Sequence, residues 1–230
     1  MKPTASNLIR WAGLSAVAAG VSFIVVQIIH PIDVLASVTT PGWTTVHYLS
    51  FSMCVFGLFG LVGIYARQAE KAGWLGLTGY LLFSVFYMVT GAFQFIEALV
   101  SPVLAIEAPR YVEGFLGMVT GHAGEISMGA LPTVNSVNGL LYMLGSLALG
   151  IATFRARVLP RWAAMLLAVS GPLAAAMTTL LSHPLDRLAA VPMGVALVGL
   201  GLAVWANRRE PAAQTAATSA SPTLRQAGAR

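Results

Sequence analysis

Six long apolar runs divide this chain of 230 residues, and together they leave room for only one kind of fold. A helix needs about 20 apolar residues to cross the hydrocarbon core of a bilayer, and each run comes close to that length. Hydrophobic residues make up 57% of the chain and charged residues only 9%, whereas a soluble domain has roughly 25% charged residues. The sequence therefore predicts an all-α, multi-pass membrane helix bundle with the lipid bilayer as its partner. Its six predicted transmembrane helices cover residues 11–29, 46–66, 74–100, 137–154, 162–181 and 188–206.

The distribution of basic residues predicts the orientation of this bundle. Eleven of the thirteen Lys and Arg residues fall on the side of the two termini, and only Arg110 and Arg187 fall on the other side. Because Lys and Arg concentrate in cytoplasmic loops, we expect both termini in the cytoplasm and the protein in the inner (plasma) membrane. The bases are scattered singly between apolar runs, so no nucleic-acid surface is expected.

A short internal repeat marks two of the predicted turns. Residues 30–38 (HPIDVLASV) recur as residues 183–191 (HPLDRLAAV), with six of nine positions identical. Proline interrupts a helix, and an aspartate suits the cap of the helix that follows, so Asp33 and Asp186 are predicted caps. Since Arg-Trp-Ala also precedes each copy, at Arg10 and Arg161, we predict a duplicated hairpin in which helices one and two match helices five and six.

The only long connection, 101–135, is predicted to lie outside the cell. Its apolar residues recur on one side of a helix, which predicts a short amphipathic helix on the outer membrane surface or capping the bundle. That stripe consists of Tyr111, Val112, Phe115, Leu116 and Val119. The transmembrane domain would then cover residues 1–206. Residues 207–230 have no apolar periodicity and are predicted to form a disordered cytoplasmic tail.

Two turn sequences carry a resemblance to a known group. The inner turn 155–162 (RARVLPRW) and the outer turn 29–33 (IHPID) resemble those of uncharacterised six-helix bacterial membrane proteins of actinobacterial type. The resemblance covers most of residues 10–206. It implies the fold and topology, and no activity, cofactor or catalytic residue.

Polar side chains of the apolar runs gather in the outer third of the predicted helices. On each helix they recur at helical spacing, and such a face is expected to point away from lipid, where hydrogen-bonding groups would be unsatisfied. We therefore predict an outward-facing polar pocket that binds a small molecule or an ion. The predicted lining residues are Gln27, His30, His47, Gln94, Glu97, Asn138, Ser182 and His183. The alternative is that these groups form hydrogen bonds that only fix the packing of the helices.

All four histidines belong to the predicted outer face, which suggests a metal site. Imidazole and carboxylate ligands suit zinc or another divalent ion, and the candidates are His47, Glu97, His122, Glu125 and His183. The single cysteine and the spacings match no zincin, bis-cysteine or c-type haem motif. Of the two cofactors considered, a divalent metal such as zinc is favoured over haem. The hypotheses left open are a small-molecule or ion-binding protein such as a transporter, a metal-dependent membrane enzyme, a haem or quinone redox protein, and a structural or regulatory subunit without a ligand.

Overall fold

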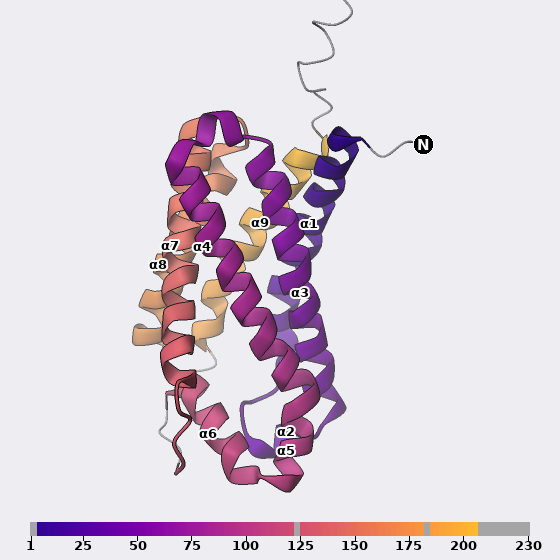
Figure 1. Ribbon diagram of the computed structural model, residues 1–230, viewed down its shortest axis with the longest axis vertical. Helices are drawn as coiled ribbons and strands as arrows, with labels where there is room; N and C mark the ends of the chain where they lie inside the picture. Colours follow the sequence, from indigo (N-terminus) through magenta and orange to yellow (C-terminus); the bar gives the residue numbers. More distant parts are fainter. Residues whose placement is uncertain (1–3, 122–124, 182–184, 207–230) are drawn as a thin grey trace, which may run out of the picture.

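The computed structural model describes residues 4–121, 125–181 and 185–206, and in these ranges the chain is built of helices without a strand. Six long helices run along the bundle (Figure 1): α1 (Ala5–Ile29), α3 (Pro41–Ala66), α4 (Ala69–Phe95), α7 (Leu131–Ala156), α8 (Arg161–Leu180) and α9 (Val191–Ala206). The shorter elements are α2 (Leu35–Val38), the π-helix η1 (Ile96–Val100), α5 (Ser101–Glu107), α6 (Pro109–Thr120) and the 3₁₀-helix η2 (Leu185–Ala190). The prediction of an all-helical fold is confirmed.

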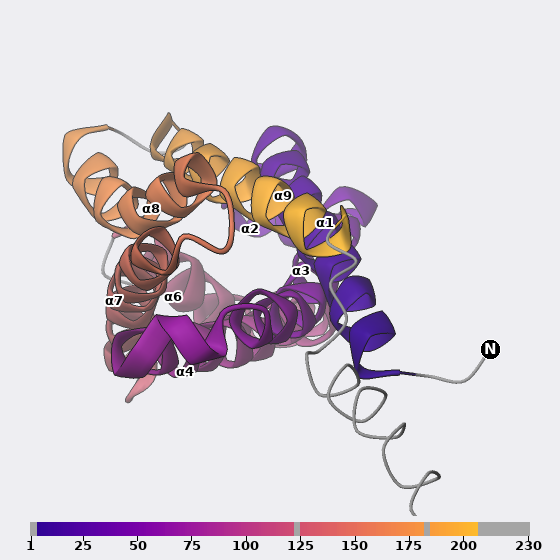
Figure 2. The same cartoon turned by 90° about the horizontal axis from the view of Figure 1, so that it is seen from above.

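The long helices are arranged as a closed ring (Figure 2). Each packs against the next in the chain, and α9 returns to pack against α1. Side chains from all six helices form one core cluster, in which Leu61, Phe83, Leu149, Leu167 and Leu200 are fully buried. Packing between the side chains of neighbouring helices closes the ring.

Glycines bring α1 and α9 into close backbone contact. A Cβ atom added at Gly20 would lie 2.5 Å from the Gly194 carbonyl oxygen, and one added at Gly13 would lie 2.8 Å from the Gly201 carbonyl oxygen. Small residues at regular spacing let transmembrane helices approach closely, and the gain is van der Waals contact along the whole interface.

The first and last helices also define one end of the bundle, called the terminal end below. Arg10 Nε donates a hydrogen bond to the Trp205 carbonyl oxygen at 3.2 Å, so α1 begins beside the point where α9 ends. The opposite end, called the α6 end, carries α2, α5 and α6 (Figure 1). The rings of Trp11, Trp74 and Trp162 are exposed near the terminal end, as expected for indoles at a membrane interface.

Five of the helices in the described ranges are long and apolar enough to cross a membrane: α1, α3, α7, a span of 39 residues from Ala69 to Glu107, and a span from Arg187 to Ala206. The helix α8 corresponds to the fifth predicted run. Its apolar part, Arg161–Met177, is shorter than the five candidate spans, and it contains Pro172. The structure therefore supports a multi-pass helical protein with five candidate spans, against the six that the sequence predicts.

The connection 101–135 is more ordered than the sequence predicts. The third predicted helix does not end at residue 100, because η1 and α5 continue it to Glu107, and α7 begins at Leu131. At the other end of this helix, Gly73 adopts a positive φ of 58°, so the unbroken helix begins at Trp74 as predicted.

The predicted amphipathic helix is present as α6. It ends at Gly121, whose φ of 79° suits a left-handed cap. Val112 and Leu116 are buried against Val38 and Trp43, while Tyr111 lies at the exposed side. Of the two predicted placements, the structure has the one in which this helix caps the bundle. The tail 207–230 lies outside the described residues.

Candidate functional site

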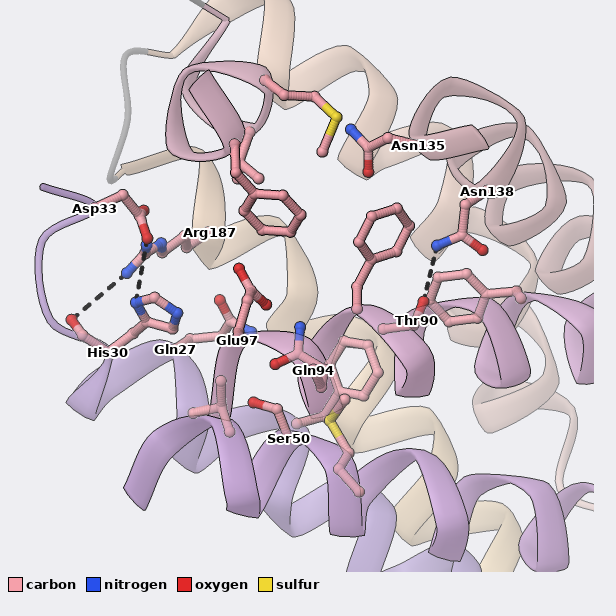
Figure 3. A pocket seen from close by; sticks show the side chains of 18 residues that line it. Gln27, His30, Asp33, Ser50, Thr90, Gln94, Glu97, Asn135, Asn138 and Arg187 are labelled. Atoms are coloured by element: carbon pink, nitrogen blue, oxygen red, sulfur yellow. Dashed lines mark hydrogen bonds and ion pairs between the residues drawn. The ribbon is translucent and has the colours of Figure 1, made fainter. Parts of the chain in front are cut away.

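A cavity of about 350 Å³ lies inside the ring at the α6 end. Its walls come from α1, α3, α4, η1 and α7, with α6 across the end and Arg187 of η2 at one side (Figure 3). Polar and aromatic side chains line it together: Gln27, His30, Asp33, Ser50, Thr90, Gln94, Glu97, Asn135, Asn138 and Arg187, with Phe23, Phe86, Phe93 and Phe115 among the apolar ones. Its volume falls in the range of about 300–1,000 Å³ that small-molecule sites occupy.

Glu97 enters the cavity from the π-helical turn η1. A π-helical turn holds an extra residue and occurs often at functional sites. Here the Glu97 carbonyl oxygen accepts a hydrogen bond from Trp43 Nε1 at 2.9 Å. Trp43 is fully buried, so the indole of α3 satisfies this carbonyl away from water and holds the turn in place.

His47 lies directly behind Glu97 and is also buried. Its Nδ1 lies 2.8 Å from the Trp43 carbonyl oxygen, and since a carbonyl only accepts, Nδ1 carries the proton. Its Nε2 then faces Glu97 Oε2 at 3.5 Å. Whether the pair is a neutral imidazole beside a carboxyl or an imidazolium beside a carboxylate, the two side chains hold one exchangeable proton between them.

An ion pair joins the two repeated turns beside this site. The Arg187 guanidinium from the second copy bonds to the Asp33 carboxylate from the first, and both side chains are largely buried. The same guanidinium lies 3.5 Å from the His30 carbonyl oxygen. The N-cap of α2 is Val34, without a side-chain hydrogen bond, so the prediction that Asp33 caps the next helix is wrong, because its carboxylate pairs with Arg187.

Two amide–hydroxyl hydrogen bonds join α7 to α4 and to Gln68, the residue just before α4. Asn138 Nδ2 donates to Thr90 Oγ1 at 2.9 Å beside the cavity, and Gln68 Nε2 donates to Thr153 Oγ1 at 2.7 Å near the terminal end. In both amides the oxygen is buried without a hydrogen-bond partner, and the same holds for Gln94 Oε1. These oxygens lie within the packed walls and are not accessible from the cavity.

The structure brings most of the predicted pocket residues together. Gln27, His30, Gln94, Glu97 and Asn138 line the cavity, and His47 lies behind Glu97. Ser182 and His183 lie outside the described residues. The predicted pocket thus corresponds to one cavity at one end of the bundle.

The structure describes three of the five predicted metal ligands. Among these three, His47 and Glu97 are in contact, while Glu125 is exposed and lies 3.9 Å from Arg110. His122 and His183 lie outside the described residues. Among the residues that are described, no group of three or more His, Cys, Asp or Glu side chains is placed to hold a metal ion.

Sequence reasoning did not select several residues of the site, among them Asp33, Arg187, Trp43 and Thr90. Asp33 and Arg187 were identified as a cap and as one of two bases on the outer side, and Trp43 was not selected at all. The signal for the first two lay in the repeat, because Arg187 replaces an apolar residue, Val34, beside the shared aspartate. Trp43 had no such signal, since a Trp near a helix start is usual at a membrane interface.

Comparison with protein-family models, curated protein sequences and solved structures finds no match for this chain. The functional argument therefore depends on the cavity and its side chains.

Proposed function

We propose that this protein is a polytopic membrane protein that binds a small molecule in the cavity at the α6 end. The observation that carries the proposal is the cavity, in which side chains from separate helices place a carboxylate, amides and hydroxyls around about 350 Å³ of space. Interhelical packing alone would fill such a space with side chains, since protein interiors leave few voids larger than a water molecule.

Six membrane crossings are part of the proposal. The start of α1 and the end of α9 lie side by side, which requires an even number of crossings, and α8 is the sixth helix in the ring beside the five candidate spans. The terminal end carries Arg10, Arg67 and Lys71, and the turn from Arg155 to Arg161. By the positive-inside rule this end faces the cytoplasm and the cavity lies toward the outside of the plasma membrane.

Duplication of a hairpin is the third part. The two copies of the repeat both lie at the α6 end, in contact through Arg187 and Asp33, and transporters are often built from duplicated units. The copies differ locally, because residues after the first Asp form the α-helical turn α2 whereas Leu185–Ala190 forms a 3₁₀-helix. An experimental structure in which α1 and α3 fail to superpose on α8 and α9 would contradict the duplication and leave the cavity unaffected.

The test of ligand binding is a screen with a matched pair of variants. The full chain in lipid nanodiscs would be screened against a library of small polar and charged molecules by thermal stabilisation, since a ligand that binds only the folded state raises Tm. Ser50→Leu places apolar volume in the cavity and should abolish any stabilisation. Ser84→Leu is the control, because each serine hydroxyl donates to the carbonyl four residues earlier in its own helix and only Ser50 lines the cavity. Equal stabilisation of the two variants by the same ligand would contradict the proposal.

A metal-dependent enzyme is the second candidate, favoured by the contact between His47 Nε2 and Glu97 Oε2. Zinc bound to such ligands would activate water. Elemental analysis and an absorption spectrum of the purified protein would show whether it carries a metal ion, a haem or neither. Under this candidate, Glu97→Gln and His47→Ala should each lower the metal content, and purified protein without metal would remove it.

A further inference from the structure

Among the described residues around the cavity, no Lys or Arg is left to balance Glu97. Of the residues that line it, Arg187 is the only Lys or Arg that the structure describes, and its charge is matched by Asp33 in the ion pair. Glu97 is 7% exposed and has the imidazole of His47 as its partner at 3.5 Å. Because this pair shares one proton, it carries no net charge by itself, and a cation that enters beside Glu97 would stabilise the carboxylate form, whereas an anion would not.

The Glu97 carboxyl also sets the hydrogen bonding that a ligand would meet at this wall. A carboxylate only accepts hydrogen bonds, and a hydrogen bond to a charged group is about twice as strong as one between neutral groups. Charge and hydrogen bonding at Glu97 therefore point to the same chemical group, an ammonium.

The remaining wall is aromatic. Phe23 of α1, Phe86 and Phe93 of α4 and Phe115 of α6 line the cavity from different sides, and their π faces attract cations. These rings also offer an apolar surface to the body of a ligand. A cavity of about 350 Å³ is far larger than a metal ion needs, since one water occupies about 30 Å³.

We propose that the cavity binds a small organic cation, a primary or secondary amine on an apolar body, with its ammonium against the Glu97 carboxylate. The proposal rests on the proposed function and names its ligand class. Glu97 supplies the charge and accepts the N–H groups, and the phenylalanine rings contact the apolar body.

Three probes with the same ring and different head groups test this proposal: benzylamine, benzyl alcohol and benzoate. Binding of each to the full chain in nanodiscs would be measured by isothermal titration calorimetry. We expect benzylamine to bind at least about tenfold more tightly than benzyl alcohol, and benzoate not to bind, because one charge-assisted hydrogen bond in a buried site is enough for a factor of ten. Glu97→Gln keeps the shape of the side chain and should abolish the preference for the amine.

Two further variants keep the test decisive. Glu107→Gln makes the same change at the same end of the bundle, on an exposed side chain outside the cavity, and should leave benzylamine binding unchanged. Glu97→Asp keeps the charge and should retain more amine binding than Glu97→Gln, which separates the role of the charge from a loss of folding. An unchanged amine preference in Glu97→Gln, or equal binding of benzyl alcohol and benzylamine, would overturn the proposal.

Failure of this proposal is distinguishable from failure of the proposed function. If only neutral or anionic molecules bind, and Ser50→Leu removes that binding while Ser84→Leu retains it, the cavity is a ligand site and the assignment to amines is wrong. If neither the probes nor the library bind, both proposals are wrong.

Discussion

The ion pair between Asp33 and Arg187 is expected to contribute most of the coupling between the two repeated turns. The side chains are 5% and 15% exposed, so removing one partner leaves the other charged, poorly hydrated and without the opposite charge of this pair. Breaking a buried pair in this way costs about 3–5 kcal/mol. For a domain of this size that corresponds to a fall in Tm of about 6–20 °C, at about 2–4 °C per kcal/mol.

A double-mutant cycle measures this coupling. Asp33→Leu and Arg187→Leu each leave one charge of the pair without the other, whereas the double variant removes both charges, so it should be more stable than the sum of the single losses predicts. The assay is thermal unfolding of the full chain in nanodiscs, followed by tryptophan fluorescence. We expect a coupling free energy of at least about 2 kcal/mol between the two positions.

The same end of the bundle provides a matched control. Arg110 and Glu125 lie 3.9 Å apart but are 77% and 79% exposed, so the same cycle there should give about 0–1 kcal/mol. If Asp33 and Arg187 couple no more strongly than this exposed pair, the argument that they form a buried ion pair between the two turns is wrong.

Three further predictions concern other parts of the chain. Gly20→Leu should lower Tm by several degrees, because its new side chain would meet the backbone of α9, while Gly139→Leu, with open space around it, should leave Tm nearly unchanged; equal effects would contradict the close α1–α9 contact. Trp43→Phe leaves the Glu97 carbonyl unpaired and should cost about 1–3 kcal/mol, with faster hydrogen exchange in residues 96–101; unchanged exchange there would count against the role of the indole. A cysteine introduced at Glu113 of α6 should react with a membrane-impermeant reagent in intact cells, since the native Cys54 is buried, and protection from that reagent would reverse the proposed topology.

The sequence allows the helices and their meeting point to be predicted, because both depend on local patterns. Apolar runs mark the helices, and polar residues at helical spacing, such as Gln94 and Glu97, mark the face that turns inward. Together they place Gln27, Glu97 and Asn138 at one end of the bundle, where the structure has the cavity.

What could not be predicted depends on contacts between distant residues. The ion pair joins Asp33 to Arg187 across most of the chain, and composition carries no information about such a pairing. The π-helical turn at Glu97 likewise depends on a tertiary contact, the hydrogen bond from Trp43. The extension of the third helix to Glu107 was not predicted from the sequence, and Pro102 lies there in the first turn of α5, a position where proline is well tolerated.

The π-helical turn also makes chain length, and not only residue type, a determinant of this end of the protein. An α-helix advances by about 100° per residue, so the extra residue in Ile96–Val100 rotates everything after it relative to α4. With that rotation, Leu104 and Ala105 of α5 face the cluster formed by Val38, Trp43, Val112 and Leu116. A deletion of one residue within this turn would restore regular α-helix yet direct α5 and α6 away from the bundle, which would uncover the cavity while every side chain named in its walls was still present.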